Sequence, residues 1–107
     1  MTYRFHHEAR VEFDAAVDWY DAHQPGLGDD FIAEVYATVQ KIVSNPHAFA
    51  RARRTPPGRE IRFLKVDRFE YVIYYEVTPS EVVILSVAHG RRGRQTWRGR
   101  LPNPPAP

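Results

Sequence analysis

The chain has no cysteine among its 107 residues, and that absence removes two classes of structure. Neither disulfide bonds nor thiolate-ligated metals are available, which is typical of a protein kept in a reducing cytoplasm. Long apolar runs are also missing, since the longest one, around residues 82–88, is far shorter than the roughly 20 residues that cross a bilayer. The first residues lack the apolar segment of a signal peptide. We therefore expect a soluble, cytoplasmic protein without membrane contact.

Conventional catalytic and cofactor signatures are absent as well. The chain contains no phosphate-binding P-loop, no Gly-x-Ser-x-Gly elbow, no His-Glu-x-x-His zinc motif and no dinucleotide fingerprint. Its one pair of histidines, His6 and His7, is adjacent, and neighbouring residues on a strand point to opposite faces. The sequence therefore predicts neither a metal site nor a cofactor.

Arginine is abundant, and it is unevenly placed. Residues 1–50 carry three basic and eight acidic side chains, whereas residues 51–107 carry twelve basic and five acidic ones, so the net charges are −5 and +7. Thirteen of the fifteen basic residues are arginine, which suits bidentate contacts with phosphate. A GC-rich genome would also favour arginine over lysine, but it does not explain the clustering. The second half predicts a surface for a polyanion or an acidic partner.

Hydrophobic periodicity predicts two amphipathic helices in the first half. Apolar residues recur at helical spacing from about residue 8 to residue 22, and again from about residue 28 to residue 44. Pro25-Gly26 between them is a strong turn signal, so the helices should form an antiparallel hairpin. The carboxylates of the first helix that fall off its apolar stripe, and are expected to face solvent, are Glu12, Asp14, Asp18 and Asp21.

Alternating apolar residues predict strands on either side of this hairpin. A short strand at residues 3–5 comes first, and a loop at residues 47–58 follows the helices. The remaining strands, at residues 60–66, 69–77 and 81–88, should form an antiparallel meander. The order β-α-α-β-β-β describes one α+β domain, residues 1–101, with the helices on one face of the sheet and the other face left for function or a partner. Residues 102–107, which include four prolines, are expected to be a flexible tail.

The run of residues 86–100 stands out because a predicted apolar strand is followed directly by a histidine, five arginines and a tryptophan. Metal-free RNA cleavage needs a general acid or base, together with cations for the charge that develops on the phosphoryl oxygens. His89 is the natural titrating group, since the ordinary histidine pKa lies near neutrality. The candidate catalytic residues are His89, Arg62 and Arg92. The candidate nucleic-acid or target-binding residues are Tyr71, Arg91, Arg92, Arg94, Trp97 and Arg98.

In this interpretation the arginines hold phosphate groups, while Trp97 or Tyr71 stacks on a splayed base. A plainer interpretation also stays open. His89 then hydrogen-bonds the end of its strand, and the arginines form a solvated surface.

A series of short motifs covers nearly the whole chain, from about residue 3 to residue 100. They are Ala9-x-x-Glu12-Phe13, Trp19-Tyr20, Gly28-x-x-Phe31, Ile42-x-x-x-Pro46, Arg62, Phe69-x-Tyr71-x-Ile73-x-Tyr75 and His89-x-Arg91-Arg92 with Trp97. Their order and spacing resemble the RelE/ParE superfamily, the toxins of type II toxin–antitoxin and plasmid-stabilisation modules. The resemblance implies a twisted antiparallel sheet on a helical hairpin, growth inhibition as the function, and a hetero-oligomer with a cognate antitoxin. The antitoxin's C-terminal segment wraps such toxins by helix-in-groove and strand-addition contacts.

Members of this superfamily inhibit growth in one of two ways. RelE-like toxins cleave messenger RNA in the ribosomal decoding site, and ParE-like toxins bind DNA gyrase and trap its cleaved complex. The nucleases carry an arginine on the third strand where this chain has Val72, and Trp97, which cannot transfer a proton, lies near the place of their terminal tyrosine. Because losing one charge-stabilising donor typically costs about 100–1,000-fold in rate, the sequence slightly favours gyrase as the target.

Three functions stay open on these grounds. The favoured one is a ParE-like toxin held inactive by an acidic and apolar antitoxin segment. The second is a ribosome-dependent endoribonuclease with His89 as acid or base and Arg62, Arg91 and Arg92 on the phosphate. The third is a non-toxic nucleic-acid-binding module. The sequence leaves open whether the protein is an enzyme.

Overall fold

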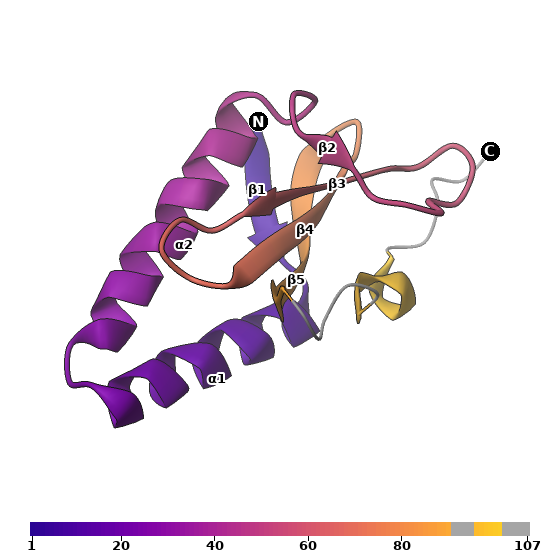
Figure 1. The fold of residues 1–107 in the computed structure, drawn as a ribbon. Helices are drawn as coiled ribbons and strands as arrows, with labels where there is room; N and C mark the ends of the chain where they lie inside the picture. The colour runs from indigo at the N-terminus through magenta and orange to yellow at the C-terminus, as the bar shows by residue number, and fades with distance from the viewer. Residues whose placement is uncertain (91–95, 102–107) are drawn as a thin grey trace.

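The computed structural model describes residues 1–90 and 96–101, and two helices pack on one side of a five-stranded sheet (Figure 1). The helices are α1 (His7–His23) and α2 (Leu27–Ser44). The strands are β1 (Thr2–Phe5), β2 (Ala50–Arg51), β3 (Glu60–Lys65), β4 (Tyr71–Val77) and β5 (Glu81–His89), and a 3-10 helix, η1 (Thr96–Arg100), follows them. The expected α+β fold, with a helical hairpin and a strand meander, is confirmed.

The last strand, β5, occupies the interior of the sheet. The strand order is β1-β5-β4-β3-β2, in which β1 pairs parallel with β5 and the meander from β3 to β5 is antiparallel. The parallel pairing ends where Phe5 lies opposite Ile84, because the chain turns into α1 after that point. The final residues of β5 therefore extend beyond β1, and this exposes one edge of β5 to other groups.

The second strand lies inside the segment expected to be a loop. Ala50 and Arg51 of β2 pair with Phe63 and Arg62 of β3, and the backbone N–H of Ala52 donates to the Ile61 carbonyl at 2.9 Å. A two-residue strand carries too little alternation to show in the sequence, so the pairing depends on β3 rather than on local pattern.

The hairpin turn is fixed by an aspartate. Gly26 adopts a left-handed conformation, with φ of 91°, and α2 begins immediately after it. A carboxylate oxygen of Asp21 accepts the backbone N–H of Gly28 at 2.7 Å. Asp21 is exposed, as expected, and it also stabilises the positive end of α2.

Both faces of the sheet carry a core. On the helix side, Phe13 and Phe31 pack with sheet residues such as Ile73 and Tyr75. On the far side, η1 places Trp97 over a second apolar cluster, which includes Ala52, Ile61, Tyr74, Val83, Leu85 and Ala88. The far face is therefore not simply left open, because the residues after β5 return and cover part of it.

Two further findings limit the kinds of site that these residues form. Across residues 1–90 and 96–101, no helix is long and apolar enough to span a membrane. The same residues contain no group of three or more histidine, aspartate or glutamate side chains that could hold a metal ion. The expected tail at residues 102–107 lies outside the described residues.

Candidate functional site

His89 lies at the end of β5, at the mouth of a surface groove. Its ring is 5.5 Å from the ring of Tyr71, which faces it across the β4–β5 ladder, and its Nε2 lies 3.8 Å from a carboxylate oxygen of Glu70. The backbone N–H of Gly90 donates to the Glu70 carbonyl at 2.7 Å, which fixes the chain just after His89. About a third of the His89 side chain, 36%, is exposed. The end of β5 thus presents a fixed, titratable ring to solvent.

The groove has a volume of about 570 Å³ and separates α1 from the end of β5. Three alanines, Ala15, Ala16 and Ala88, leave room in it, and Trp19 rises at one side with 55% of its surface exposed. The other lining residues are Glu12, Tyr20, Tyr71, Val87, His89 and Thr96. Most of this surface is apolar or aromatic, which is typical of a site that binds side chains of a partner.

The ionisable side chains that line the groove among the described residues are those of Glu12, Tyr20, Tyr71 and His89. Burial is the main cause that raises the pKa of Tyr20, with Tyr71 and Glu70 adding to it, so this phenol stays protonated at neutral pH. Among the described residues, no lysine or arginine lines the groove. A phosphate placed beside His89 would therefore find no cation from this part of the chain.

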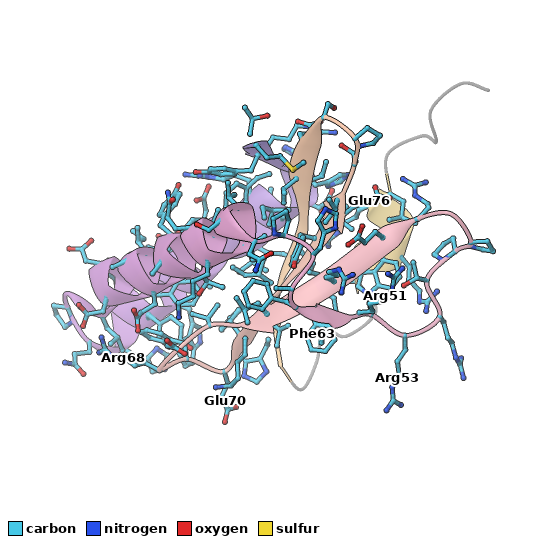
Figure 2. All side chains as sticks on the ribbon, turned by 90° about the horizontal axis from the view of Figure 1, so that it is seen from above. Arg51, Arg53, Phe63, Arg68, Glu70 and Glu76 are labelled. Atoms are coloured by element: carbon cyan, nitrogen blue, oxygen red, sulfur yellow. The ribbon has the colours of Figure 1, made fainter. Side chains whose placement is uncertain are left out.

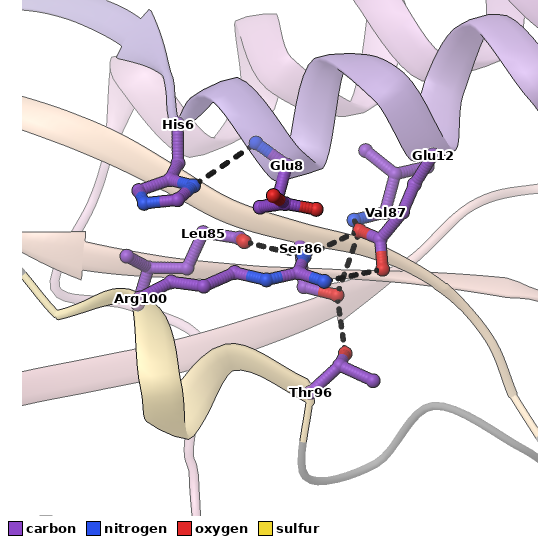
Figure 3. A network of polar contacts seen from close by, with 8 residues as sticks. All are labelled: His6, Glu8, Glu12, Leu85, Ser86, Val87, Thr96 and Arg100. Carbon is purple, nitrogen blue, oxygen red and sulfur yellow. Dashed lines mark hydrogen bonds and ion pairs between the residues drawn. The ribbon is translucent and has the colours of Figure 1, made fainter.

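Glu12, which lines the groove, is the centre of a polar network (Figure 3). Arg100 donates from Nη1 and Nη2 to the two carboxylate oxygens, at 2.7 and 3.0 Å. The hydroxyl of Ser86 also donates to Oε1 of Glu12, at 3.2 Å, and lies 2.7 Å from the Thr96 hydroxyl. The expectation that Glu12 faces solvent is therefore wrong, because its carboxylate joins α1, β5 and η1.

The same pair covers the edge of β5 that β1 leaves unpaired. Oε1 of Glu12 accepts the backbone N–H of Val87 at 3.0 Å, and Nη1 of Arg100 donates to the Leu85 carbonyl at 3.1 Å. These backbone groups would otherwise bond to a neighbouring strand. Two side chains thus take the place of a strand here, and they protect the edge from further pairing.

Trp97 lies in the far-side core, with 1% of its surface exposed. Its ring stacks on Tyr74, with centroids 6.4 Å apart and an interplanar angle of 24°. The expectation that Trp97 stacks on a splayed base is not met in this conformation, because its ring is buried. Arg98 is exposed, lies 4.8 Å above the Trp97 ring and donates to the Arg53 carbonyl at 3.0 Å.

Arg62 is not brought to His89. Nε of Arg62 donates to Glu60 and Nη1 donates to the Phe49 carbonyl, both at 2.6 Å, and 14% of its side chain is exposed. Arg62 lies opposite Tyr75 of β4, whereas His89 lies opposite Tyr71 of the same strand. Tyr71 and Tyr75 are four residues apart, so the two positions are separated by about 13 Å along β4 at the usual strand rise. Arg62 holds the β2 segment against β3, so the constellation expected around His89 lacks it.

The remaining candidate arginines, Arg91, Arg92 and Arg94, lie outside the described residues. Among the described residues, three exposed arginines lie close together in the sequence, at and after β2. Arg51 and Arg53, labelled in Figure 2, and the neighbouring Arg54 are exposed. None of the three enters an ion pair with another described residue. Arg53 also lines a second hollow, of about 440 Å³, beside Phe63 and Trp97.

Trp19 lines the groove but was not among the candidate residues, although its spacing in the sequence carried a signal. Trp19 falls outside the apolar stripe that faces the core and follows Val11 and Ala15 at four-residue spacing. A large aromatic at that position has no place in the core, so its exposure could be predicted from the spacing alone. Arg100, by contrast, was counted with the cationic run, and no local pattern shows that Glu12 neutralises it.

Comparison with known proteins agrees with this architecture. No curated protein matches the sequence. A solved structure, described as the chromosomal ParDE TA system from P. aeruginosa, superimposes with a TM-score of 0.70 at 20% identity, and the match covers 83% of this chain and 95% of that one. At that identity the likeness shows the fold alone.

The family comparison goes further than the structural one. The model of the family described as the ParE toxin of type II toxin-antitoxin system, parDE, matches residues 3–94, which is most of the chain and includes α1, the sheet and His89. Together with the shared fold, this match shows that the chain belongs to the ParE toxin family of type II toxin–antitoxin systems.

Proposed function

We propose that this ParE-family toxin inhibits growth by acting on DNA gyrase rather than by cleaving RNA, and that a cognate antitoxin neutralises it in a hetero-oligomer. The observation that carries the choice of target is the surroundings of His89. The groove that His89 borders is lined by aromatic and apolar residues, without a cation from the described part of the chain. Arg62 is hydrogen-bonded to the Glu60 carboxylate and to the Phe49 carbonyl, and the Trp97 ring is buried.

A surface of this kind supports binding better than chemistry. Metal-free cleavage of RNA depends on charged donors held around the phosphate, and each one lost lowers the rate steeply. Binding to a protein target needs shape and apolar anchors instead, and Trp19, Tyr71 and the alanines of the groove provide them. Action on gyrase and its DNA agrees with the cytoplasmic location expected from the sequence.

The direct test uses purified toxin with purified gyrase and plasmid DNA. We expect the toxin to lower supercoiling and to accumulate cleaved DNA in the presence of ATP, and we expect His89→Ala to retain most of this effect. The matched assay supplies purified ribosomes and messenger RNA, where we expect no cleavage. Site-specific cleavage by the wild type that His89→Ala abolishes would overturn the proposal in favour of the nuclease.

The nuclease alternative is favoured by one observation. His89 is partly exposed, lies at an open groove and has Glu70 within 3.8 Å, so it could exchange protons with a bound substrate. The third alternative, a non-toxic nucleic-acid-binding module, is favoured by the exposed arginines after β2. Induced expression in a bacterial host, with RNA cleavage and DNA damage profiled together, separates all three, because a non-toxic module causes neither lesion.

A further inference from the structure

The chain at and after β2 concentrates positive charge. Arg51, Arg53 and Arg54 are all exposed, and we call residues 51–54 the arginine segment. The sequence around it offers no compensating charge, because residues 35–59 contain no aspartate or glutamate. Six other described arginines each form an ion pair with a carboxylate, namely Arg4, Arg10, Arg59, Arg62, Arg68 and Arg100. The arginine segment differs from them, and its charge is available to an anion from outside the chain.

The backbone of the arginine segment is fixed by hydrogen bonds. The Ala52 N–H donates to the Ile61 carbonyl at 2.9 Å, and the Thr55 hydroxyl donates to the Ala52 carbonyl at 2.8 Å. Arg98 donates from Nη2 to the Arg53 carbonyl at 3.0 Å. Ala52 is buried in the far-side core, whereas the side chain of Arg53 extends away from the ribbon in Figure 2. The cations therefore project from a fixed backbone, which lowers the freedom lost on binding.

Arg54 adopts a left-handed backbone conformation, with φ of 56°. This conformation is uncommon for a residue with a side chain, and strain of this kind is enriched at functional sites. Arg68 is the other residue besides glycine that has a positive φ in the described part of the chain, and its guanidinium lies 3.5 Å from Asp30. Arg54 has no such carboxylate among the described residues, so its strain points to a role for the exposed cation itself.

The cationic surface is extended rather than confined to one pocket. Arg51 lines a hollow of about 520 Å³, and Arg53 lines the separate hollow of about 440 Å³ beside Phe63. The described lining of the second hollow includes no acidic side chain. The carboxylate of the first hollow, Glu60, is already bonded to Arg62 at 2.6 Å. A row of cations that passes from one hollow to the next suits a linear polyanion better than a small anion.

The aromatic side chains beside the arginine segment are packed against one another. The rings of Phe63 and Tyr74 lie 5.5 Å apart, and Tyr74 stacks on Trp97 at 6.4 Å. Binding of single strands depends on exposed aromatic faces that stack on bases. The surface is therefore better suited to the phosphate backbone of a duplex, whose bases are already stacked.

A protein partner is less well served by this surface. Of the large apolar side chains that are exposed among the described residues, Val11 and Trp19 lie on α1. Met1, the third, approaches the arginine segment only at the hollow lined by Arg51. An interface with a protein is usually centred on a well-packed aromatic anchor, whereas binding to a nucleic-acid backbone needs only spaced cations.

We propose that the arginine segment binds the phosphate backbone of double-stranded DNA without reading its sequence, and that through it the toxin contacts the DNA held by gyrase. Guanidinium groups bind phosphate oxygens bidentately, and such contacts position a protein without specifying a sequence. The contact with gyrase-held DNA rests on the proposed function, which supplies gyrase. The arginine segment shares no residue with the groove at His89, and β2 lies at the edge of the sheet opposite β1. A protein in the groove and DNA on the segment therefore need not compete.

The first test titrates the purified full-length toxin into fluorescently labelled duplexes of about 20 base pairs, between about 50 and 200 mM salt. We expect two duplexes of unrelated sequence to bind equally. The double variant Arg51→Gln with Arg53→Gln should reduce the slope of log K against log salt by about 2, since each phosphate contact contributes about 0.9. Arg4→Gln is the matched control, because it removes an exposed arginine from β1, and it should leave the slope unchanged.

Three outcomes of this titration would overturn the proposal. One is a wild-type toxin that does not bind the duplex at the lowest salt, or that binds with the same slope as the double variant. Another is tighter binding of a single strand of the same length, which would indicate stacking on bases. The third is displacement of the duplex by a lower concentration of a glutamate peptide of equal charge, which would indicate an acidic protein partner.

The second test adds gyrase and separates this inference from the proposed function. Purified gyrase, plasmid and ATP are incubated with the wild type, the double variant or Arg4→Gln. We expect the wild type and Arg4→Gln to accumulate equal amounts of cleaved DNA, and the double variant about five-fold less, while it still binds gyrase without DNA. Equal cleavage with the double variant overturns the contact with gyrase-held DNA. No cleavage with the wild type overturns gyrase as the target, and the duplex titration alone then decides whether the segment binds DNA.

Discussion

The guanidinium of Arg100 donates two hydrogen bonds, of 2.7 and 3.0 Å, to the carboxylate of Glu12, which lies 88 residues away in the sequence. The two side chains are 14% and 24% exposed, so the pair is largely withdrawn from solvent. Breaking a buried pair from one side leaves the other charge uncompensated, which costs about 3–5 kcal/mol when burial is complete.

Replacing Glu12 should therefore destabilise the protein in a way that depends on Arg100. Because the pair keeps some exposure, we expect Glu12→Gln to lower the free energy of unfolding by about 2–3 kcal/mol, and Arg100→Met by a similar amount. The double variant should lose less than the sum of the two, by about 1 kcal/mol or more. Denaturant unfolding of the four proteins measures this coupling, and strictly additive losses would show that the pair does not act jointly.

Truncation of the two tryptophans should change the free energy of unfolding by very different amounts. Trp97 is 1% exposed, so Trp97→Ala leaves a cavity and should cost about 3–5 kcal/mol of unfolding free energy. Trp19 is 55% exposed, and Trp19→Ala should stay within about 0.5 kcal/mol of the wild type. Thermal and urea unfolding provide the comparison. A larger loss for Trp19→Ala than for Trp97→Ala would contradict the placement of both rings.

The stability should depend on pH through His6. Its Nδ1 accepts the Glu8 backbone N–H at 3.1 Å, and burial, followed by the charge of Arg100, lowers the pKa of His6 from its usual 6.5. The unfolded chain then binds the proton more readily, so this contribution is complete above about pH 6.5 and is lost as the pH falls toward the folded pKa. Arg100→Met should raise the pKa of His6, as followed by NMR.

A variant without the titrating ring provides the control. His6→Asn keeps an acceptor at the start of α1 and should be nearly as stable at about pH 8. Between about pH 8 and about pH 5 it should lose less stability than the wild type. Identical losses in the two proteins would assign the pH dependence to other groups.

Gly28 should tolerate no side chain. A Cβ built there would lie 2.6 Å from carboxylate atoms of Asp21, whose hydrogen bond caps α2. Gly28→Ala should therefore cost about 1–2 kcal/mol, because the buried N–H loses its acceptor. Gly99→Ala is the matched control, since a Cβ there meets no atom within 4 Å, and it should be close to neutral. Unfolding midpoints compare the two, and equal midpoints would rule out this role for Asp21.

Much of the fold could be predicted because most helices and strands follow from the local spacing of apolar residues. The stripe containing Phe13 and Tyr20 repeats every three to four residues, and Tyr71, Ile73 and Tyr75 alternate, so one helix and one strand each follow from short windows. The far-side core could not be predicted in this way. Trp97 is buried by η1, one short turn after the cationic run, and its position depends on a distant contact with Tyr74.

The candidate site was only partly visible in the sequence for the same reason. The end of an apolar strand locates His89, and the structure places it at a groove with Tyr71, which was also a candidate. Alternation also assigns a face to Arg62, but not its bond to the Phe49 carbonyl, thirteen residues away. A periodic pattern predicts which side of a helix or strand faces the core. It does not predict which distant group will form a hydrogen bond or ion pair with a given arginine.

The interior position of β5 has a consequence for how the protein is made. This strand pairs with β1 on one side and β4 on the other, yet it comes last among the described strands in chain order. Until the ribosome has released residues 81–89, β1 has no partner, and the aromatic side chains of α1 have no β5 to cover them. A nascent chain therefore assembles this sheet only after residues 81–89 have left the ribosome, and a chain truncated before Glu81 cannot assemble it at all.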